Sequence, residues 1–257
     1  MLLTIDVGNT QIALGMFDGD ELVGHWRFGT DRTRTADELR WELLGVLAMD
    51  GFARSDIAGV ALSSVVPALT ATFRLVGPAL SDGPLVVVEP GVRTGMPIHI
   101  DNPREVGADR IVNSVAARAR YGTPVIVVDF GTSTNFDVVG PDGDYLGGVI
   151  AAGLEISTNA LIGGTAALRT VEFVAPRSPI GKGTVEAIQS GALYGHAGLV
   201  DGVMERLVEA LGTDATRIAT GGLASTIVPY CRSVETVDEY LTLEGLRIIY
   251  SLNREDP

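Results

Sequence analysis

The chain has 257 residues, of which 46% are hydrophobic and 20% are charged, and its mean hydropathy is +0.27. This apolar content is enough for one large core or two smaller ones, and it excludes intrinsic disorder. The formal charge of −13 at pH 7 argues against general binding to nucleic acid or to anionic membranes. A nucleotide in a local site is compatible with this charge, because a metal ion and backbone amides can supply positive charge.

The cysteine content and the hydropathy pattern indicate a soluble cytoplasmic protein. Cys231 is the single cysteine, so the chain can form neither an internal disulfide nor a cysteine-rich zinc site. Asp6 interrupts the opening apolar run, so a signal peptide is not expected. No apolar stretch of the sequence is long enough to span a bilayer.

The two halves of the sequence share a pattern of strands and turns. An apolar run ending in Asp-x-Gly occurs at residues 2–10 and again at 125–133, and an Asp-Gly turn follows at 18–24 and again at 142–148. The offsets are 129 − 6 = 123 and 142 − 18 = 124 positions. Asp-Gly between apolar runs is a strong hairpin signal, and two such hairpins could coincide by chance. Two matches in the same order favour an internal duplication in which each half opens with three strands.

Helices and further strands are predicted after each hairpin. The capping box at residues 35–38 begins a helix with Leu39, Leu43, Val46 and Leu47 on one face. The other predicted elements are helices at 103–120, 185–211 and 241–253, and strands at 57–66, 85–88 and 218–220. No low-complexity linker separates the halves, and the expected domains are residues 1–117 and 118–257.

The two Asp-x-Gly loops carry side chains suited to a phosphorylated ligand. Asp6 and Asp129 each end a buried strand, where a cleft is expected in an α/β sheet. Because carboxylates repel phosphate, these two are better placed to ligate hard cations that bridge to phosphate. The neighbouring amide and hydroxyl donors are Asn9, Thr10, Thr132 and Ser133. One such loop can be an ordinary turn, whereas two related loops form a two-sided phosphate clamp.

A third group of candidate residues lies at 101–110, where the predicted helix begins at Pro103. Gly107 and Ala108 remove side-chain bulk beside Asp109 and Arg110, so a small molecule can approach the helix there. Arg110 can bind a carboxylate or phosphate by a forked contact, and Asp109 can accept a proton from an attacking hydroxyl. The alternative is an exposed helix with ordinary surface charges.

Several other site types are not expected. Residues 181–184 read Gly-Lys-Gly-Thr, but they lack the earlier glycine that a Walker-type phosphate loop requires. The protein-kinase His-Arg-Asp motif is absent from the sequence. The three histidines are scattered, which argues against a histidine metal site or a catalytic triad, and Trp26 and Trp41 are interpreted as core residues.

Taken together, six segments of the chain resemble the type III pantothenate kinases. They are residues 6–10, 101–110, 129–132, 147–151, 181–186 and 219–222. They occur in order over nearly the whole chain. The Gly-Ala-Asp-Arg segment in its setting is highly specific, whereas the Asp-x-Gly loops belong to a wider superfamily.

This resemblance implies a fold and an activity. The fold is α/β, with duplicated ribonuclease-H-like domains of the actin, sugar kinase and heat-shock ATPase superfamily and ATP in the cleft between the halves. The implied activity is ATP-dependent phosphorylation of pantothenate to 4′-phosphopantothenate, the first committed step of coenzyme A synthesis, by a cytoplasmic homodimer. Mg²⁺ would accompany the nucleotide, and a monovalent cation, K⁺ or NH₄⁺, would bind at Asp129.

The resemblance also implies roles for individual residues. The loop for the ATP phosphates comprises Asp6, Val7, Gly8, Asn9, Thr10, Gln11, Ile12 and Ala13, with Thr132 contributing from the second half. Pantothenate would contact Gly107, Ala108, Asp109 and Arg110, with Asp109 as the base. Thr184, from the partner subunit, would complete the pantothenate pocket.

Four positions depart from the family's usual pattern, namely Ile100, Asn135, Ala152 and Gly183. Ile100 stands where many members have a tyrosine that touches substrate. These departures are interpreted as tuning, or alternatively as marks of a member with poor catalysis. Two other functions are weighed against pantothenate phosphorylation. One is a sugar or small-acid kinase of the same fold, and the other is a nucleotide- or pantothenate-sensing regulator without turnover.

Overall fold

The computed structural model describes residues 1–165 and 170–254, which form two compact units. The first unit comprises Met1–Ala116 together with the C-terminal segment from Leu241, and the second comprises Ala117–Tyr240. The expected domains, 1–117 and 118–257, differ from these units at the C-terminal segment. The reason is that the last helix of the chain packs on the first sheet.

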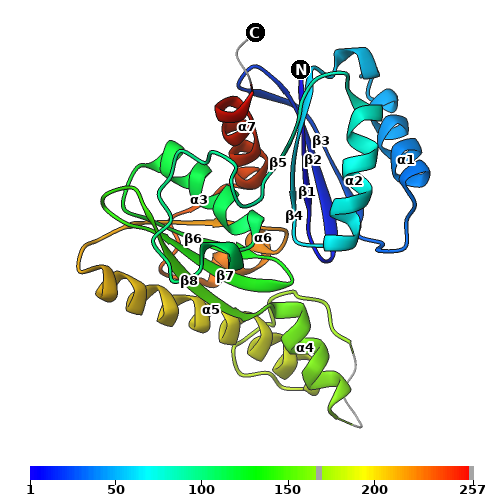
Figure 1. Cartoon of the computed structure of the whole chain (residues 1–257). Coiled ribbons are helices and arrows are strands. Elements are labelled where there is room, and N and C mark those ends of the chain that lie inside the picture. Colours follow the sequence, from blue (N-terminus) through cyan, green and yellow to red (C-terminus); the bar gives the residue numbers. More distant parts are fainter. Residues whose placement is uncertain (166–169, 255–257) are drawn as a thin grey trace. The chain divides into compact units, whose positions relative to one another are not determined.

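The first unit is built on a five-stranded mixed sheet (Figure 1). Its strands are β1 (Leu2–Val7), β2 (Gln11–Asp18), β3 (Glu21–Gly29), β4 (Gly59–Ser64) and β5 (Leu85–Val87). Its helices are α1 (Ala36–Met49), α2 (Pro67–Leu80), α7 (Leu241–Asn253) and the first part of α3 (Ala108–Tyr121), with 3₁₀ turns at Arg54–Asp56 and Pro103–Glu105. The strand order is β3-β2-β1-β4-β5, in which β1 is antiparallel to β2 and parallel to β4.

Different helices cover the two faces of this first sheet (Figure 1). Leu3, Ile5 and Val7 alternate along β1 and join the core with the apolar faces of α1 and α2. On the other face, α7 packs against β1, β2 and β4. Gly59 is required here, because a side chain at this position would overlap the Tyr250 ring of α7.

The second unit repeats this plan with a second five-stranded sheet (Figure 1). Its strands are β6 (Val125–Phe130), β7 (Ser133–Val139), β8 (Tyr145–Ala152), β9 (Thr216–Thr220) and β10 (Thr236–Val237). Its helices are α4 (Leu154–Gly163), α5 (Thr184–Leu211) and α6 (Ala224–Ile227), with a 3₁₀ turn at Val228–Tyr230. Helices α5 and α6 contribute to the core that covers one face of this sheet.

The topology confirms the duplication that the sequence predicts. Each sheet runs in the order third, second, first, fourth, fifth strand, counted along its own half of the chain. The register between the second and third strands shifts once in each sheet, at Met16/Phe17 and at Val138/Val139. Both turns carry a glycine with positive φ, Gly19 and Gly143. A chance pair of hairpins would not reproduce the parallel fourth and fifth strands.

The predicted helices at 35–47 and 185–211 are confirmed. The Thr35 N–H donates to the Glu38 carboxylate (2.8 Å) and the Glu38 N–H donates to Thr35 Oγ1 (3.4 Å), so the capping box is formed. Helix α5 runs to Leu211 and ends at Gly212, whose φ of 67° closes the last turn. Among the residues that the structure describes, none of the helices combines the length and apolar character needed to cross a bilayer.

The predicted helix at 103–120 is wrong in its first turn. Asn102 caps a separate 3₁₀ turn at Pro103–Glu105 by accepting from the Arg104 N–H (3.3 Å). Val106 is then extended, with φ −75° and ψ 129°, and α3 begins only at Ala108. The local cap at Asn102 therefore competes with helix formation, and Asp109 lies in the first turn of α3.

Candidate active site

The first Asp-x-Gly loop is a tight turn between β1 and β2. The Gly8 N–H donates to Gln11 O (2.9 Å), and a Cβ on Gly8 would lie 2.9 Å from that same oxygen. Asn9 and Thr10 are exposed at the tip of the turn. Asp6 is partly buried beneath it, at the carboxyl end of β1. The loop thus presents polar groups to solvent with a carboxylate behind them.

Ser63 supports the Asp6 carboxylate from the neighbouring strand. Asp6 and Ser63 are paired in register between the parallel strands β1 and β4, and the buried Ser63 hydroxyl donates to Asp6 Oδ1. This hydrogen bond fixes the direction of the carboxylate. Sequence reasoning missed Ser63, although a serine at the end of a buried strand in an α/β sheet is a usable signal.

The Asp109 carboxyl lies in a confined position at the start of α3. A Cβ on Gly107 would lie 2.5 Å from Asp109 Oδ1, so a side chain at position 107 would displace the carboxyl. The Arg110 N–H donates to the same oxygen (2.9 Å). Burial raises the pKa of Asp109, and the Arg110 N–H and guanidinium oppose that rise only in part. This environment differs from the exposed surface charge that was the alternative interpretation.

Val65 joins the Asp109 segment to the first loop. The Val65 N–H donates to Val7 O (3.0 Å) at the end of β1. The Val65 side chain packs against the Gly107 segment, because Val65 Cγ1 lies 3.6 Å from the position that a Cβ on Gly107 would take. Within the first unit, Val65 therefore links the segment of the candidate base to the end of β1 that leads into the candidate phosphate loop, although about 100 residues separate the two in the sequence.

The second Asp-x-Gly loop is packed against a glycine turn. Gly221 has φ 94°, and a side chain there would overlap Asp129 Oδ1 and lie 2.6 Å from the Phe130 N. The Ala224 N–H donates to Gly221 O (3.1 Å), which makes residues 221–224 the turn from β9 into α6. The Gly221 backbone therefore closes one side of Asp129.

Gly153 supports the tip of the second loop. Gly131 and Thr132 are exposed, and the Gly131 N–H donates to Ser133 O (3.0 Å). A side chain on Gly153, at the junction of β8 and α4, would overlap the carbonyl oxygen of Thr132. The sequence motif at 147–151 ends two residues before Gly153, so it did not include the glycine that makes this contact.

Comparisons with known proteins identify the family of the chain. A family model described as type III pantothenate kinase matches residues 2–206. A protein of that name from Acidothermus cellulolyticus is 53% identical over 255 residues, which cover 98% of this chain and 99% of that protein. The chain belongs to the type III pantothenate kinase family.

Solved structures show how widely the fold of this kinase is shared. A Campylobacter jejuni structure whose description names the Baf family of transcriptional activators has a TM-score of 0.62 at 16% identity, over 98% of both chains. The inorganic polyphosphate/ATP-glucomannokinase of Arthrobacter sp. strain KM has a TM-score of 0.53 at 16% identity, over 98% of this chain and 99% of that one. At such identities the likeness shows the fold alone, which is the duplicated α/β fold found in sugar kinases.

Thr184 of the kinase is exposed at the first position of α5. The turn before it is tied by Glu186, which pairs with Arg177 (2.6 Å) and accepts from the Lys182 N–H (2.9 Å). The Arg177 hydrogen bond lowers the pKa of Glu186, so this carboxylate stays charged. Gly183, one of the four departures from the family pattern, is the residue that precedes the helix.

Asn135 and Ala152, two further departures from the family pattern, both lie next to Ser133 at the second loop. The Ser133 hydroxyl donates to Asn135 Oδ1 (2.9 Å), and Ser133 pairs with Ala152 between β7 and β8. Ile100 is partly buried in the segment before the Asn102 cap. Neither of the two contacts of Ser133 involves the side chains of Asp6, Asp109, Asp129 or Thr132.

The kinase lacks a protein-made metal cage in its described part. Within residues 1–165 and 170–254, no three His, Cys, Asp or Glu side chains cluster so as to hold a metal ion. Mg²⁺ in nucleotide sites is held by one or two carboxylates together with phosphate oxygens and water. Asp6 and Asp129 each place a carboxylate at the carboxyl end of a strand, beside a loop.

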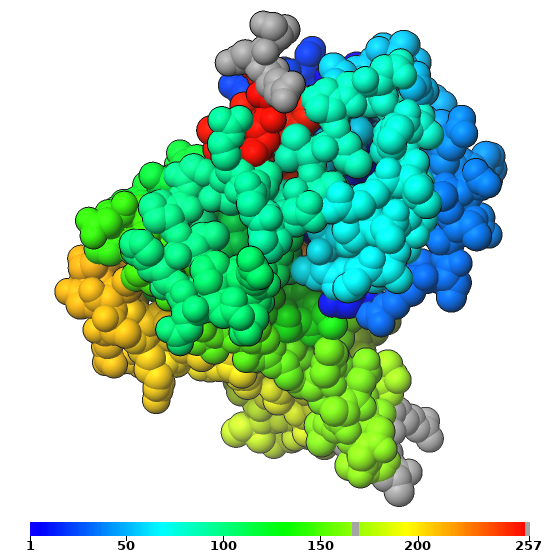
Figure 2. All heavy atoms as spheres, in the orientation of Figure 1, coloured from blue at the N-terminus to red at the C-terminus, as the bar shows by residue number. Residues whose placement is uncertain are grey.

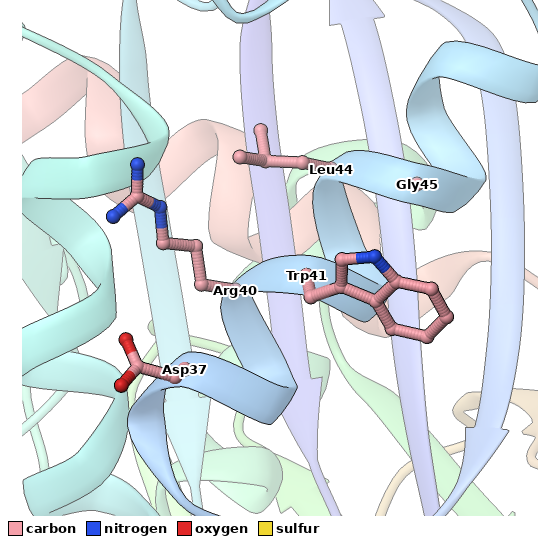
Figure 3. A pocket seen from close by; sticks show the side chains of 5 residues that line it. All are labelled: Asp37, Arg40, Trp41, Leu44 and Gly45. Carbon is pink, nitrogen blue, oxygen red and sulfur yellow. The ribbon is translucent and has the colours of Figure 1, made fainter.

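A surface pocket of about 470 Å³ lies elsewhere, on α1 (Figure 3). Its lining residues are Asp37, Arg40, Trp41, Leu44 and Gly45, none of which belongs to the predicted site. Trp41 is 80% exposed, so its interpretation as a core residue is wrong. The core face of α1 is instead formed by Leu39, Leu43 and Leu47, and Trp41 lies off that face.

Proposed function

We propose that the kinase transfers the γ-phosphoryl group of ATP to the primary hydroxyl of pantothenate, giving 4′-phosphopantothenate and ADP. Family membership supports the reaction, and the observation that carries it is the position of Asp109 beside the first loop through Val65. Asp109 accepts the hydroxyl proton as the oxygen attacks phosphorus, and the bond to the bridging oxygen of ADP breaks. The raised pKa of Asp109 makes its carboxylate a stronger proton acceptor than an exposed aspartate.

The polar loops bind the nucleotide in this proposal. Residues 6–13, with Thr132 from the second unit, hold the ATP phosphates through backbone and side-chain donors. Asp129 would hold K⁺ or NH₄⁺, and this ion and the Mg²⁺ that accompanies ATP would supply positive charge against the phosphates. Asp6, whose carboxylate is fixed by the Ser63 hydroxyl, orients the cation that binds together with the nucleotide.

The Gly107–Arg110 segment binds pantothenate. Gly107 carries no side chain, so the backbone of this segment can approach the substrate closely. Arg110 binds the pantothenate carboxylate by a forked contact, which positions the hydroxyl at the other end of the molecule. Such positioning is the larger part of the work in phosphoryl transfer, because the protein does little covalent chemistry itself.

Thr184 serves the pocket of the partner subunit in a cytoplasmic homodimer. His196 of α5 contacts Thr134, next to the second loop, at a distance of 2.9 Å. Thr184 lies twelve residues earlier on the same helix, about 18 Å along its axis. The loop of the same unit is therefore remote from Thr184 along the helix, which supports a role for Thr184 in another subunit.

Exposed apolar side chains of the second unit support the same homodimer. They are Ile150, Ile156, Leu161, Val174, Ile180 and Val185, with exposures from 47% to 73%. Helix α4 and the start of α5, which carry three of them, lie at the molecular surface (Figure 2). A surface with this many large apolar groups is typical of a protein–protein interface.

The test is ADP release from ATP, measured with pantothenate, with a sugar acceptor and with no acceptor, each with and without K⁺. The proposal expects turnover only with pantothenate and an increase with K⁺. Turnover with the sugar alone would instead support a sugar kinase of the same fold. Binding of ATP and pantothenate without ADP release would support a regulator.

A further inference from the structure

Arg32 lies beside the first loop, a position that sequence reasoning did not assign to the site. The Arg32 Nη2 donates to Asn9 Oδ1 (2.9 Å), and both residues are exposed. Arg32 follows β3 and reaches the loop from the segment that leads into α1. A guanidinium next to a candidate phosphate loop is chemically suited to an anionic ligand.

The segment that carries Arg32 is fixed to the loop by Thr30. The Thr30 N–H donates to Thr10 O (2.9 Å), and its hydroxyl donates to Gly8 O (2.7 Å). Two carbonyl groups of the loop are thereby engaged on the side of Thr30. Carbonyl oxygens repel phosphate, and two of those in the loop accept hydrogen bonds from Thr30 instead. The same contacts place Arg32 at the tip of the loop.

Carboxylates near Arg32 in the sequence are committed elsewhere. Asp31 accepts from the N–H (2.9 Å) and hydroxyl (2.7 Å) of Thr33, and these hydrogen bonds lower the pKa of Asp31. Glu42 pairs with Arg34. Within residues 1–165 and 170–254, Arg32 forms no ion pair, and its polar partner is Asn9. Its positive charge is thus not neutralised by a carboxylate of the described chain.

The contact also orients the Asn9 amide. A guanidinium only donates, so Asn9 must present its oxygen to Arg32, and the two N–H donors of its Nδ2 then face away from Arg32. Arg32 itself has five N–H donors, of which this contact uses one. The pair therefore offers several donors and one positive charge at the tip of the loop.

We infer that Arg32 binds the polyphosphate chain of the nucleotide and holds Asn9 with its amide donors toward that chain. This inference rests on the proposed function, because it takes ATP as the ligand of the first loop. It assigns the kinase a phosphate-binding cation outside the Asp-x-Gly motif. Such a cation offsets locally the overall field of a chain of formal charge −13, which opposes ATP.

The test is calorimetric binding of MgATP and of adenosine to the full chain without pantothenate, so that it does not depend on turnover. We expect Arg32→Ala to weaken MgATP binding about tenfold or more and to leave adenosine binding unchanged. Arg32→Lys should weaken MgATP binding less, because it keeps the charge but loses the fork. The matched control is Arg40→Ala, which removes an exposed arginine of the first unit from the α1 pocket (Figure 3) and should leave MgATP binding as in the parent.

A second variant separates charge from orientation. If Arg32 also acts through Asn9, the loss caused by Arg32→Ala should be smaller in an Asn9→Ala background than in the parent. Equal MgATP affinities for Arg32→Ala and Arg40→Ala would overturn the inference. An equal loss for adenosine and MgATP would overturn it too, since the loop would then be distorted. A parent chain that fails to bind MgATP would instead overturn the proposed function.

Discussion

Asp109 combines two properties that oppose each other at the scale of one residue. Burial favours its protonated form, whereas the proposed reaction uses the ionised carboxylate. The Arg110 N–H and guanidinium recover part of the cost of that charge. A carboxyl held in this way is a better base than an exposed one, and it is also a source of instability.

Asp109→Asn keeps the shape of the side chain and removes the base. We expect turnover to fall by about 10²-fold or more, with ATP binding retained. ADP release and calorimetric ATP binding measure the two effects separately. Turnover close to that of the parent would remove Asp109 from the base role.

The same substitution should raise stability at neutral pH. The pKa of Asp109 is higher in the folded state than in the unfolded state. Between these two pKa values the folded state keeps a proton that the unfolded state has released, so the free energy of unfolding falls as the pH rises from the lower value to the higher one. Asn carries no such charge, so the variant should melt at a higher temperature than the parent at pH 7 to 8. The difference should shrink as the pH is lowered toward the ordinary range of aspartate. A variant less stable than the parent at every pH would contradict this account.

Gly221 illustrates how a backbone position can control a carboxylate. Gly221→Ala would place a methyl group against Asp129 Oδ1 and would strain a φ of 94°. We expect a loss of stability of about 1–3 kcal/mol and a weaker response of turnover to K⁺. Gly212→Ala is the matched control, because its φ of 67° brings similar strain but nothing lies within 4 Å of its Cβ. Equal K⁺ responses in the two variants would show that the contact with Asp129 is unimportant.

At the scale of elements, α7 completes the first unit. Its buried face includes Leu246 and Ile249, and Gly245 packs against the Val112 backbone of α3. The Thr242 hydroxyl also donates to the buried Asn113 side chain (2.7 Å). The first sheet therefore has one face covered only when the last helix of the chain is in place.

Leu246→Ala should destabilise the first unit. Leu246 is fully buried, and truncation of such a leucine costs about 2–5 kcal/mol through lost burial and the cavity that it leaves. Urea unfolding measures the change. Leu252→Ala, on the same helix but 40% exposed, is the control and should cost much less. Similar costs for both variants would show that α7 contributes little packing to the sheet.

At the scale of the whole molecule, the proposed dimer makes a prediction about mixed subunits. If each site takes Asp109 from one subunit and Thr184 from its partner, a dimer of Asp109→Asn and Thr184→Ala chains contains one intact site. Mixing the two inactive variants after subunit exchange should then restore about a quarter of the parent activity. Light scattering of the parent and of the mixture gives the oligomeric state. Dimers without restored activity would place both residues in the same subunit's site.

Local sequence patterns were sufficient for much of the fold and for the two loops of the candidate site. The capping box at Thr35, the Asp-Gly turns and the two Asp-x-Gly loops act through residues close together in the chain, so their geometry follows from the residue types. The internal repeat predicted, for the same reason, that each half opens with three strands. The helix start near Pro103 was placed wrongly, because the Asn102 cap and a continuous helix are both locally allowed there.

The contacts that join distant segments were decided only by the tertiary structure. Ser63 on Asp6, Val65 beside Gly107, Arg32 on Asn9 and α7 on the first sheet each connect residues more than twenty positions apart. A sequence pattern reports the periodicity and propensity of neighbouring residues, but it does not specify which strand ends or helix faces meet. Those pairings come from strand order, register and the packing of side chains in three dimensions.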